Sequence, residues 1–258
     1  MIEFKEIFKI GFIYELNYKF YVVFKLFFNI IPLIITLLIW NALYNSNTDI
    51  TTILSQNSMI GYIIFANIAY NVISVDAYEI SSDIKDGNLN QYLLKPIHYI
   101  KNKFMLYLSK FIFNFILYFF PIGIFCCFYS ISLSKLLMFF SLLFVSFLIS
   151  FFINCILSLL AFWFMDVSAL FSMLSFIMSF LAGTLIPIDL MPDFLKQISF
   201  FLPFRYLGYE TASILFFEKN YNEFLVILLG GIIWTVILYI ISKILWKKGI
   251  KIYGAYGG

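Results

Sequence analysis

Residues 136–165 read LLMFFSLLFVSFLISFFINCILSLLAFWFM, a run of apolar and small polar side chains without a single charge. A helix needs about 20 mostly apolar residues to cross the hydrocarbon core of a bilayer. This run is longer than that, so we expect its helix to tilt or to project beyond the lipid. The stretch predicts an all-α integral membrane protein.

The composition supports the same class. Of the 258 residues, 63% are hydrophobic and 12% are charged, and the mean hydropathy is +0.96. A soluble domain carries roughly 25% charged residues, so a soluble globular protein is excluded. Five further apolar runs join the first and predict six transmembrane helices in total: residues 26–47, 59–75, 111–134, 167–188 and 224–242. Prolines inside two of these runs are compatible with membrane helices.

Residues 1–20 mix charged and apolar side chains in a helical pattern. Ile7, Ile10, Ile13 and Tyr14 can share one face, with the charges largely opposite. A secretory signal has an uninterrupted apolar core instead. The pattern predicts an amphipathic helix that lies in the membrane interface.

Lysines in the connections predict the orientation. They gather in residues 1–25, in the polar stretch 76–103 and in the tail after residue 242, whereas residues 46–58 hold neither Lys nor Arg. Because basic loops stay in the cytoplasm, both termini are expected there. Abundant Ile, Phe, Lys and Asn suggest an A+T-rich bacterial genome, and hence a bacterial plasma membrane.

Motifs for catalysis or cofactor binding are missing from the sequence. There is no GxxxxGK[ST] phosphate loop, no HExxH and no GxSxG. His98 is the only histidine, and the three cysteines lie in apolar runs without CxxC spacing, which argues against a metal site. We therefore expect no enzyme activity and no cofactor in this chain. The net charge of +3 gives no reason to expect a nucleic-acid partner.

Residues 79–97 form the most informative connection. Gly87 is expected to break one helix, and Asn88 with Gln91 resembles a capping box that starts the next. Leu89, Tyr92 and Leu93 then share a face, and Pro96 ends the helix. The pattern predicts a short helix with an exposed apolar face, which is either an ordinary connector or a docking surface for a cytoplasmic partner.

Small polar residues recur at helical spacing in three of the predicted spans. They are Asn67, Asn71 and Ser74; Ser146, Ser150, Asn154 and Ser158; and Ser168, Ser172, Ser175 and Ser179. Such stripes either allow close helix packing or line a substrate path. No charged residue lies in the middle of a predicted span, which disfavours an ion-coupled carrier.

Residues 185–222 are too apolar for a solvated loop and too interrupted for a span. Pro187, Pro192 and Pro203 punctuate them and predict an outer re-entrant hairpin of two short helices. Arg205 is expected to reach lipid headgroups or, alternatively, to contact substrate.

Three segments together resemble the ABC-2 type permeases, the membrane subunits of ATP-binding-cassette exporters. The first is IKDGNLNQYLLKP (residues 84–96), similar to the gating-helix loop of that family. The second is the hairpin before the last span, which ends in PFRY (residues 203–206). The third is the ending WKKGIKIYGAYGG (residues 246–258), similar to that of a drug-export branch.

The resemblance implies a single transmembrane domain over residues 1–258 that works as a half-transporter. Two ABC ATPase subunits would bind ATP and Mg²⁺ and dock beneath it, and a second permease chain, identical or homologous, would complete the pathway. The coupling residues implied are Glu79, Asp83, Gly87, Leu89, Tyr92, Leu93, Lys95 and Pro96. Spans two and five would line the seam, which gives Asn67, Asn71, Ser172, Ser175 and Ser179 a place on the substrate path.

The implied cargo is an amphiphilic drug, peptide antibiotic or lipid that moves outward, because the stripes are neutral and the spans are rich in phenylalanine. The alternative is an ion-coupled transporter or a channel that acts without an ATPase. A membrane-embedded enzyme is a third class, and the sequence offers it no catalytic constellation.

Overall fold

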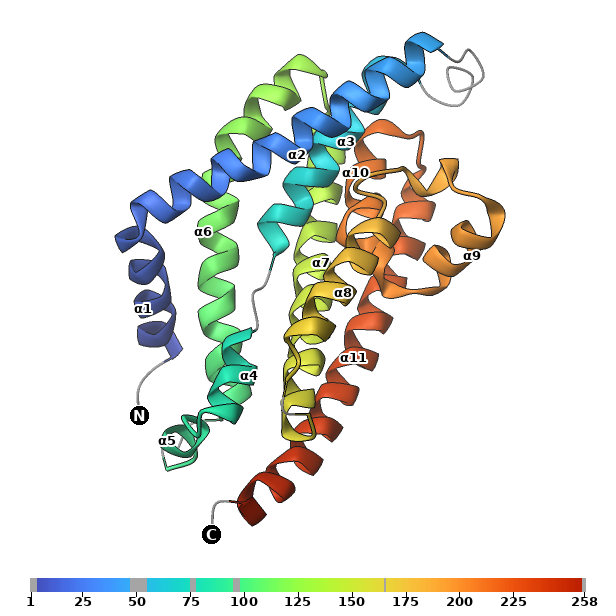
Figure 1. The fold of residues 1–258 in the computed structure, drawn as a ribbon. Helices are drawn as coiled ribbons and strands as arrows, with labels where there is room; N and C mark the ends of the chain where they lie inside the picture. The colour runs from blue at the N-terminus through green and yellow to red at the C-terminus, as the bar shows by residue number, and fades with distance from the viewer. Residues whose placement is uncertain (1–3, 47–54, 75–77, 95–97, 165, 257–258) are drawn as a thin grey trace.

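The computed structural model describes residues 4–46, 55–74, 78–94, 98–164 and 166–256 (Figure 1). Within these ranges the regular structure consists of helices, which confirms the predicted all-α class. Figure 1 shows α4 (Tyr78–Lys85), α5 (Leu89–Leu93) and the C-terminal part of α11 (Tyr221–Tyr256) at one end of the molecule. The segments α9 (Asp193–Phe201) and α10 (Tyr209–Phe216) lie toward the other end.

Five helices in the described part of the chain are long and apolar enough to cross a membrane. They are α2 (Lys19–Ser46), α3 (Gln56–Ile73), α6 (Tyr99–Phe128), α7 (Leu133–Leu159) and α11. Pro32 in α2 and Pro121 in α6 sit inside their helices, as the sequence predicts.

The predicted fifth span, residues 167–188, contains a shorter helix, α8 (Ser168–Leu181). Its 14 residues rise about 21 Å, less than the roughly 30 Å of hydrocarbon that a span crosses. The helix ends before Gly183, whose φ of +72° lies in the left-handed region that favours glycine. The six-span count therefore stays a prediction.

The helix α6 begins twelve residues earlier than the predicted third span, which started at residue 111. The added turns carry three lysines. Lys103 and Lys110 have carboxylate partners on neighbouring helices, and Lys101 is exposed. These positions allow the helix to continue through the charges. The helix α11 likewise runs on through the basic tail that sequence patterning placed outside the last span.

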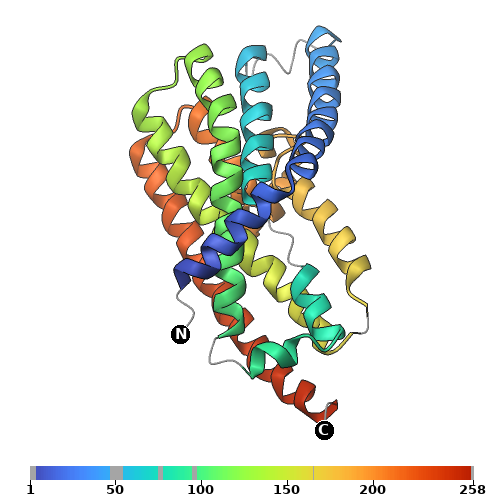
Figure 2. The same cartoon turned by 90° about the vertical axis from the view of Figure 1, so that its left-hand side faces the viewer.

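The core is built around α7, which packs against α3, α4, α10 and α11. Phenylalanines of α7 pack against neighbouring helices, and Phe147 stacks on Phe111 of α6 with ring centroids 4.5 Å apart. Phe147 and Phe151 are almost wholly buried. In Figure 2, α8 lies at the edge of the bundle, where Met173 and Phe176 are exposed.

The helix α1 (Phe4–Asn17) falls within the predicted interface helix and packs along α6. Ile7 is buried, and Gly11 lies directly against Ser109 of α6, whereas Ile10 remains exposed. The helix α2 presents most of its apolar surface outward and is tied down by Trp40, whose indole N–H donates to Leu185 O at 3.0 Å.

We predict that Gly183→Ala destabilises the protein. A Cβ at this position would lie 2.9 Å from the Tyr62 hydroxyl and 3.0 Å from Tyr209 Cβ, on a backbone that disfavours L side chains. The left-handed conformation alone costs about 1–2 kcal/mol for a residue with a Cβ. A thermal melt of the purified protein should show a clear drop in the midpoint.

Gly123→Ala is the matched control, because the new methyl group would have nothing within 4 Å and the backbone there is helical. Alanine favours a helix interior over glycine by roughly 0.5–1 kcal/mol, so this midpoint should stay equal or rise. Equal melting of the two variants would contradict the assigned role of Gly183.

Candidate functional site

The predicted coupling loop folds as two short helices joined at a glycine. The helix α4 ends at Lys85, the chain turns at Gly87 with φ +75°, and α5 begins at Leu89. A Cβ on Gly87 would have nothing within 4 Å, so its conformation rather than crowding explains the glycine. Lys95 and Pro96 lie outside the described residues.

Two details of this loop differ from the sequence prediction. Asn88 has helical φ and ψ and makes no capping hydrogen bond, so the predicted capping box is wrong. The backbone N–H groups of Asn90 and Gln91 instead bond to Gly87 O and Asn88 O. Leu89 is fully buried, because the turn at Gly87 points it into the core.

The exposed apolar surface of α5 is consequently smaller than predicted and shifted toward its C-terminal end. Leu93 is 45% exposed and Leu94 is 88% exposed. Tyr92 lies edge-on to Tyr99 of α6, with ring centroids 5.2 Å apart. Of the three residues predicted to share an exposed face, only Leu93 is strongly exposed.

The polar face of α4 is clamped to α6. Asp83 Oδ2 lies 2.9 Å from Lys103 Nζ and accepts a hydrogen bond of 2.7 Å from the Tyr99 hydroxyl. Glu79 Oε2 lies 3.4 Å from the same Lys103 Nζ, which also faces the rings of Tyr92 and Tyr99 at 5.7 Å. The predicted coupling residues Glu79, Asp83 and Tyr92 thus converge on one lysine.

Sequence reasoning missed Lys103 and Tyr99. The charge pattern assigns Lys103 only a part in setting the orientation, yet it is 4% exposed. A buried ammonium requires a charged or aromatic partner, and a lysine at the start of an apolar helix was the available signal. The same cluster extends to α11, because Tyr99 stacks on Trp246 with ring centroids 5.3 Å apart.

A second link joins α4 to the start of α8. Lys85 Nζ lies 3.3 Å from Asp166 Oδ1, and Asp166 also accepts hydrogen bonds from the backbone N–H and the hydroxyl of Ser168. The Ser168 backbone N–H, the Ser168 hydroxyl and Lys85 lower the pKa of Asp166 to about 2. The carboxylate therefore keeps its charge throughout the physiological pH range, and the link loses its charge only as the pH falls toward 2.

The predicted substrate-path residues divide into two groups. The side-chain amides of Asn67 and Asn71 bond to their own helix, α3, where they donate to Ile63 O and Asn67 O, respectively. Ser172 and Ser179 do the same in α8, with Ser168 O and Phe176 O as acceptors. Ser175 makes no such bond among the described residues and lines a cavity with residues of α3 and α7.

The outer hairpin, residues 185–222, lies wholly within the described chain and is more divided than predicted. Its helical segments are η3 (Ile188–Leu190), α9, η4 (Pro203–Leu207) and α10. Pro187 and Pro192 directly precede η3 and α9, and Pro203 opens η4. The prolines therefore mark the starts of segments, as their fixed φ favours. Entry of the hairpin into lipid stays a prediction.

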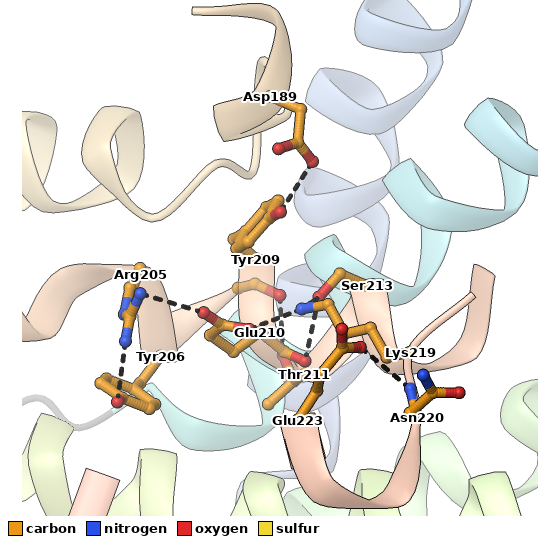
Figure 3. Close-up of polar contacts among 11 residues, drawn as sticks. Asp189, Arg205, Tyr206, Tyr209, Glu210, Thr211, Ser213, Lys219, Asn220 and Glu223 are labelled. Atoms are coloured by element: carbon orange, nitrogen blue, oxygen red, sulfur yellow. Dashed lines mark hydrogen bonds and ion pairs between the residues drawn. The ribbon is translucent and has the colours of Figure 1, made fainter. Parts of the chain in front are cut away.

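A buried carboxylate holds this hairpin together (Figure 3). Glu210 is 1% exposed, and its two oxygens face Arg205 at 3.4 Å and Lys219 at 2.7 Å. Lys219 also donates to the Ser213 hydroxyl at 2.6 Å. Tyr209 donates to Asp189 at 2.7 Å from the opposite side of the segment.

Arg205 has intramolecular partners that neither sequence interpretation included, and its contact with substrate stays a prediction. Its guanidinium pairs with Glu210 and lies over the rings of Phe200 and Tyr206, at 5.0 Å and 5.1 Å, instead of extending toward headgroups. Sequence reasoning missed Glu210, although an acid within the apolar stretch 206–217 was a usable signal. The cluster joins η4, α10 and the connection that leads to α11.

Comparison with known proteins places this arrangement in a family. A family model described as ABC-2 family transporter protein matches residues 30–257 of the chain. The chain belongs to the ABC-2 transporter family. No curated protein matches it.

Membership in this family tells what kind of protein carries the geometry described above. An ABC-2 transporter protein is the multi-pass membrane permease of an ABC transporter and associates with ABC ATPase partners. Subunits of the ABC-2 type are generally non-catalytic. The clamped loop of α4 and α5 is therefore the candidate for contact with an ATPase partner.

We predict that Asp83→Asn destabilises the protein by about 3–5 kcal/mol, the usual cost of leaving one buried charge of a pair alone. Lys103, with a side chain 5% exposed, would be left with only the partly exposed Glu79 as an ionic partner. The double variant Asp83→Asn with Lys103→Met should recover much of the loss in chemical unfolding. Glu79→Gln, at a side chain 61% exposed, should change stability by less than about 1 kcal/mol.

We also predict that Glu210→Gln lowers stability by about 3–5 kcal/mol, because Arg205 and Lys219 lose their shared carboxylate. Glu218→Gln is the matched control, since Glu218 is exposed and makes no part of the cluster. Unfolding curves that coincide for the two variants would show that the buried cluster does not hold the hairpin.

Proposed function

We propose that this chain is the permease subunit of an ABC exporter that moves an amphiphilic drug, peptide antibiotic or lipid outward. Two ATPase subunits in trans bind ATP and Mg²⁺ and drive it, and a second permease chain, identical or homologous, completes the pathway. With α8 counted as a short fifth crossing, the chain spans a bacterial plasma membrane six times and keeps both termini in the cytoplasm.

The observation that carries the proposal is the asymmetry of the α4–α5 loop. Its polar side is tied to α6 through Asp83, and its tip presents Leu93 and Leu94 to the outside. Exposed leucines at a polar end of a membrane protein favour protein contact. An ATPase docked on these leucines would bind the loop through apolar contacts, and the salt bridges of α4 would stay intact.

The loop also has contacts through which a displacement can spread. The helix α4 packs against α7 and the following turn η2 (Leu160–Phe162). Tyr78 lies edge-on to Phe171 of α8, with ring centroids 6.1 Å apart, and Lys85 reaches Asp166 just before α8. A push on α5 would therefore move the base of α8 together with α4.

The second permease chain is proposed to cover the exposed faces of α2 and α8. Phe24 and Phe28 of α2 and Met173 and Phe176 of α8 are more than half exposed. Lipid alone can cover such surfaces, but α8 carries the small polar side chains that close helix packing uses. This arrangement places Ser172, Ser175 and Ser179 near the seam, with Asn67 and Asn71 on the neighbouring span.

We predict that the double variant Leu93→Asp with Leu94→Asp abolishes ATPase docking. Tagged protein is purified from its native cells, and ATP hydrolysis is measured in the eluate. Since an apolar anchor in an interface contributes about 2 kcal/mol or more, hydrolysis per permease should fall at least about tenfold. Both leucines are exposed, so the variant should insert and melt like the parent.

Phe194→Asp is the matched control, because Phe194 is a comparably exposed apolar residue (72%) on α9 in the outer hairpin. Its eluate should keep full ATP hydrolysis. Undiminished hydrolysis in the leucine variant would refute the docking surface, and transport by liposomes that contain this chain alone would refute the dependence on an ATPase.

A further inference from the structure

A cavity of about 170 Å³ lies where the three polar stripes approach one another. Its wall takes Tyr70 and Ser74 from the α3 region, Ser150 and Asn154 from α7, and Ser175 from α8. The apolar part of the wall consists of Ile73, Met178 and Leu207. The described wall carries hydroxyl and amide groups and no charge.

Several of these polar groups have no partner within the described chain. The hydroxyls of Tyr70, Ser150 and Ser175 make no hydrogen bond there, although Ser150 is only 6% exposed. Asn154, 8% exposed, uses its amide N–H on Ser150 O and leaves its side-chain oxygen unbonded among the same residues. Polar groups that line a cavity and have no partner among these residues can bond to a ligand that enters it.

The unpaired groups of the wall accept more hydrogen bonds than they donate. A hydroxyl offers two acceptor lone pairs and one donor, and a side-chain amide oxygen only accepts. Tyr70, Ser150 and Ser175 contribute hydroxyls, and Asn154 contributes its amide oxygen. The wall therefore favours a ligand that brings its own O–H or N–H groups.

We propose that this cavity binds the neutral, hydrogen-donating head of an amphiphilic substrate, a hydroxyl or amide group. The proposal rests on the proposed function and adds the chemical class of the group recognised. A volume of about 170 Å³ is several times the roughly 30 Å³ share of one water molecule, which is enough for such a head. The absence of charged groups from the described wall excludes recognition of a carboxylate or phosphate by ion pairing.

Ser175 offers a direct readout because it is both exposed and part of the wall. The variant Ser175→Cys is reconstituted in nanodiscs with its co-purified subunits, and alkylation at position 175 by N-ethylmaleimide is timed by peptide mass spectrometry. Dodecanamide, whose head carries two N–H donors, should slow alkylation about tenfold, the factor expected from one or two hydrogen bonds. Methyl dodecanoate, with the same acyl chain and no donor, should not.

Two further variants test whether the protection depends on the cavity wall. Adding Ser150→Ala to Ser175→Cys removes a buried wall hydroxyl and should abolish protection by dodecanamide. Ser172→Cys, one turn away on α8 and outside the wall, should react at the same rate with or without either probe. Equal protection by both probes, no protection by either, or protection that survives Ser150→Ala would overturn the site.

These outcomes are separate from those of the docking experiment. Loss of ATP hydrolysis in the eluate of the Leu93 and Leu94 variant does not involve the cavity. A preparation that keeps its ATPase but shows no protection at position 175 refutes the cavity and leaves the exporter assignment intact.

Discussion

Burying a charge in a low-dielectric medium is costly unless the charge has a close partner, and the rest of this structure depends on how that requirement is met. At the end of the molecule that holds α4 and α5, Lys103 lies between Asp83 and Glu79. In the outer hairpin, Glu210 lies between Arg205 and Lys219. Each cluster joins different helical segments, so pairing these charges also holds the segments together. The apolar helices between the two clusters pack through phenylalanine rings that have no comparable directional preference.

The cluster around Lys103 explains why the loop of α4 and α5 suits the coupling role proposed for it. Three of its polar groups, those of Glu79, Asp83 and Lys85, are engaged with α6 or with the turn before α8, so a displacement of the loop is passed on to them. Its exposed leucines offer a partner an apolar contact. A loop held in this way passes a displacement at a small contact surface on to several helices, and it needs no catalytic groups to do so.

The sequence predicts the helical membrane class, the break at Gly87 and the interruption of residues 185–222 by prolines, because these follow from local hydrophobicity and backbone preference. It does not predict the partners of Lys103 or Glu210, because ion pairs between different helices depend on how the helices pack. The same limit explains the errors. Leu89 has the exposed pattern of an amphipathic helix, but the turn before it decides that it is buried. The early start of α6 escapes prediction because hydropathy places lysines outside the membrane, whatever carboxylates lie beside them.

The ion pairs of α6 also bear on how the chain is made. Both of its paired lysines meet acids that come earlier in the chain: Glu15 for Lys110, and Asp83 for Lys103. At a synthesis rate of about 5–20 residues per second, Asp83 leaves the ribosome roughly 1–4 s before Lys103. Each of these two lysines therefore emerges when its carboxylate is already available, and each can pair as soon as α6 forms. The order of residues along the chain thus lets both charges be neutralised without waiting for later segments.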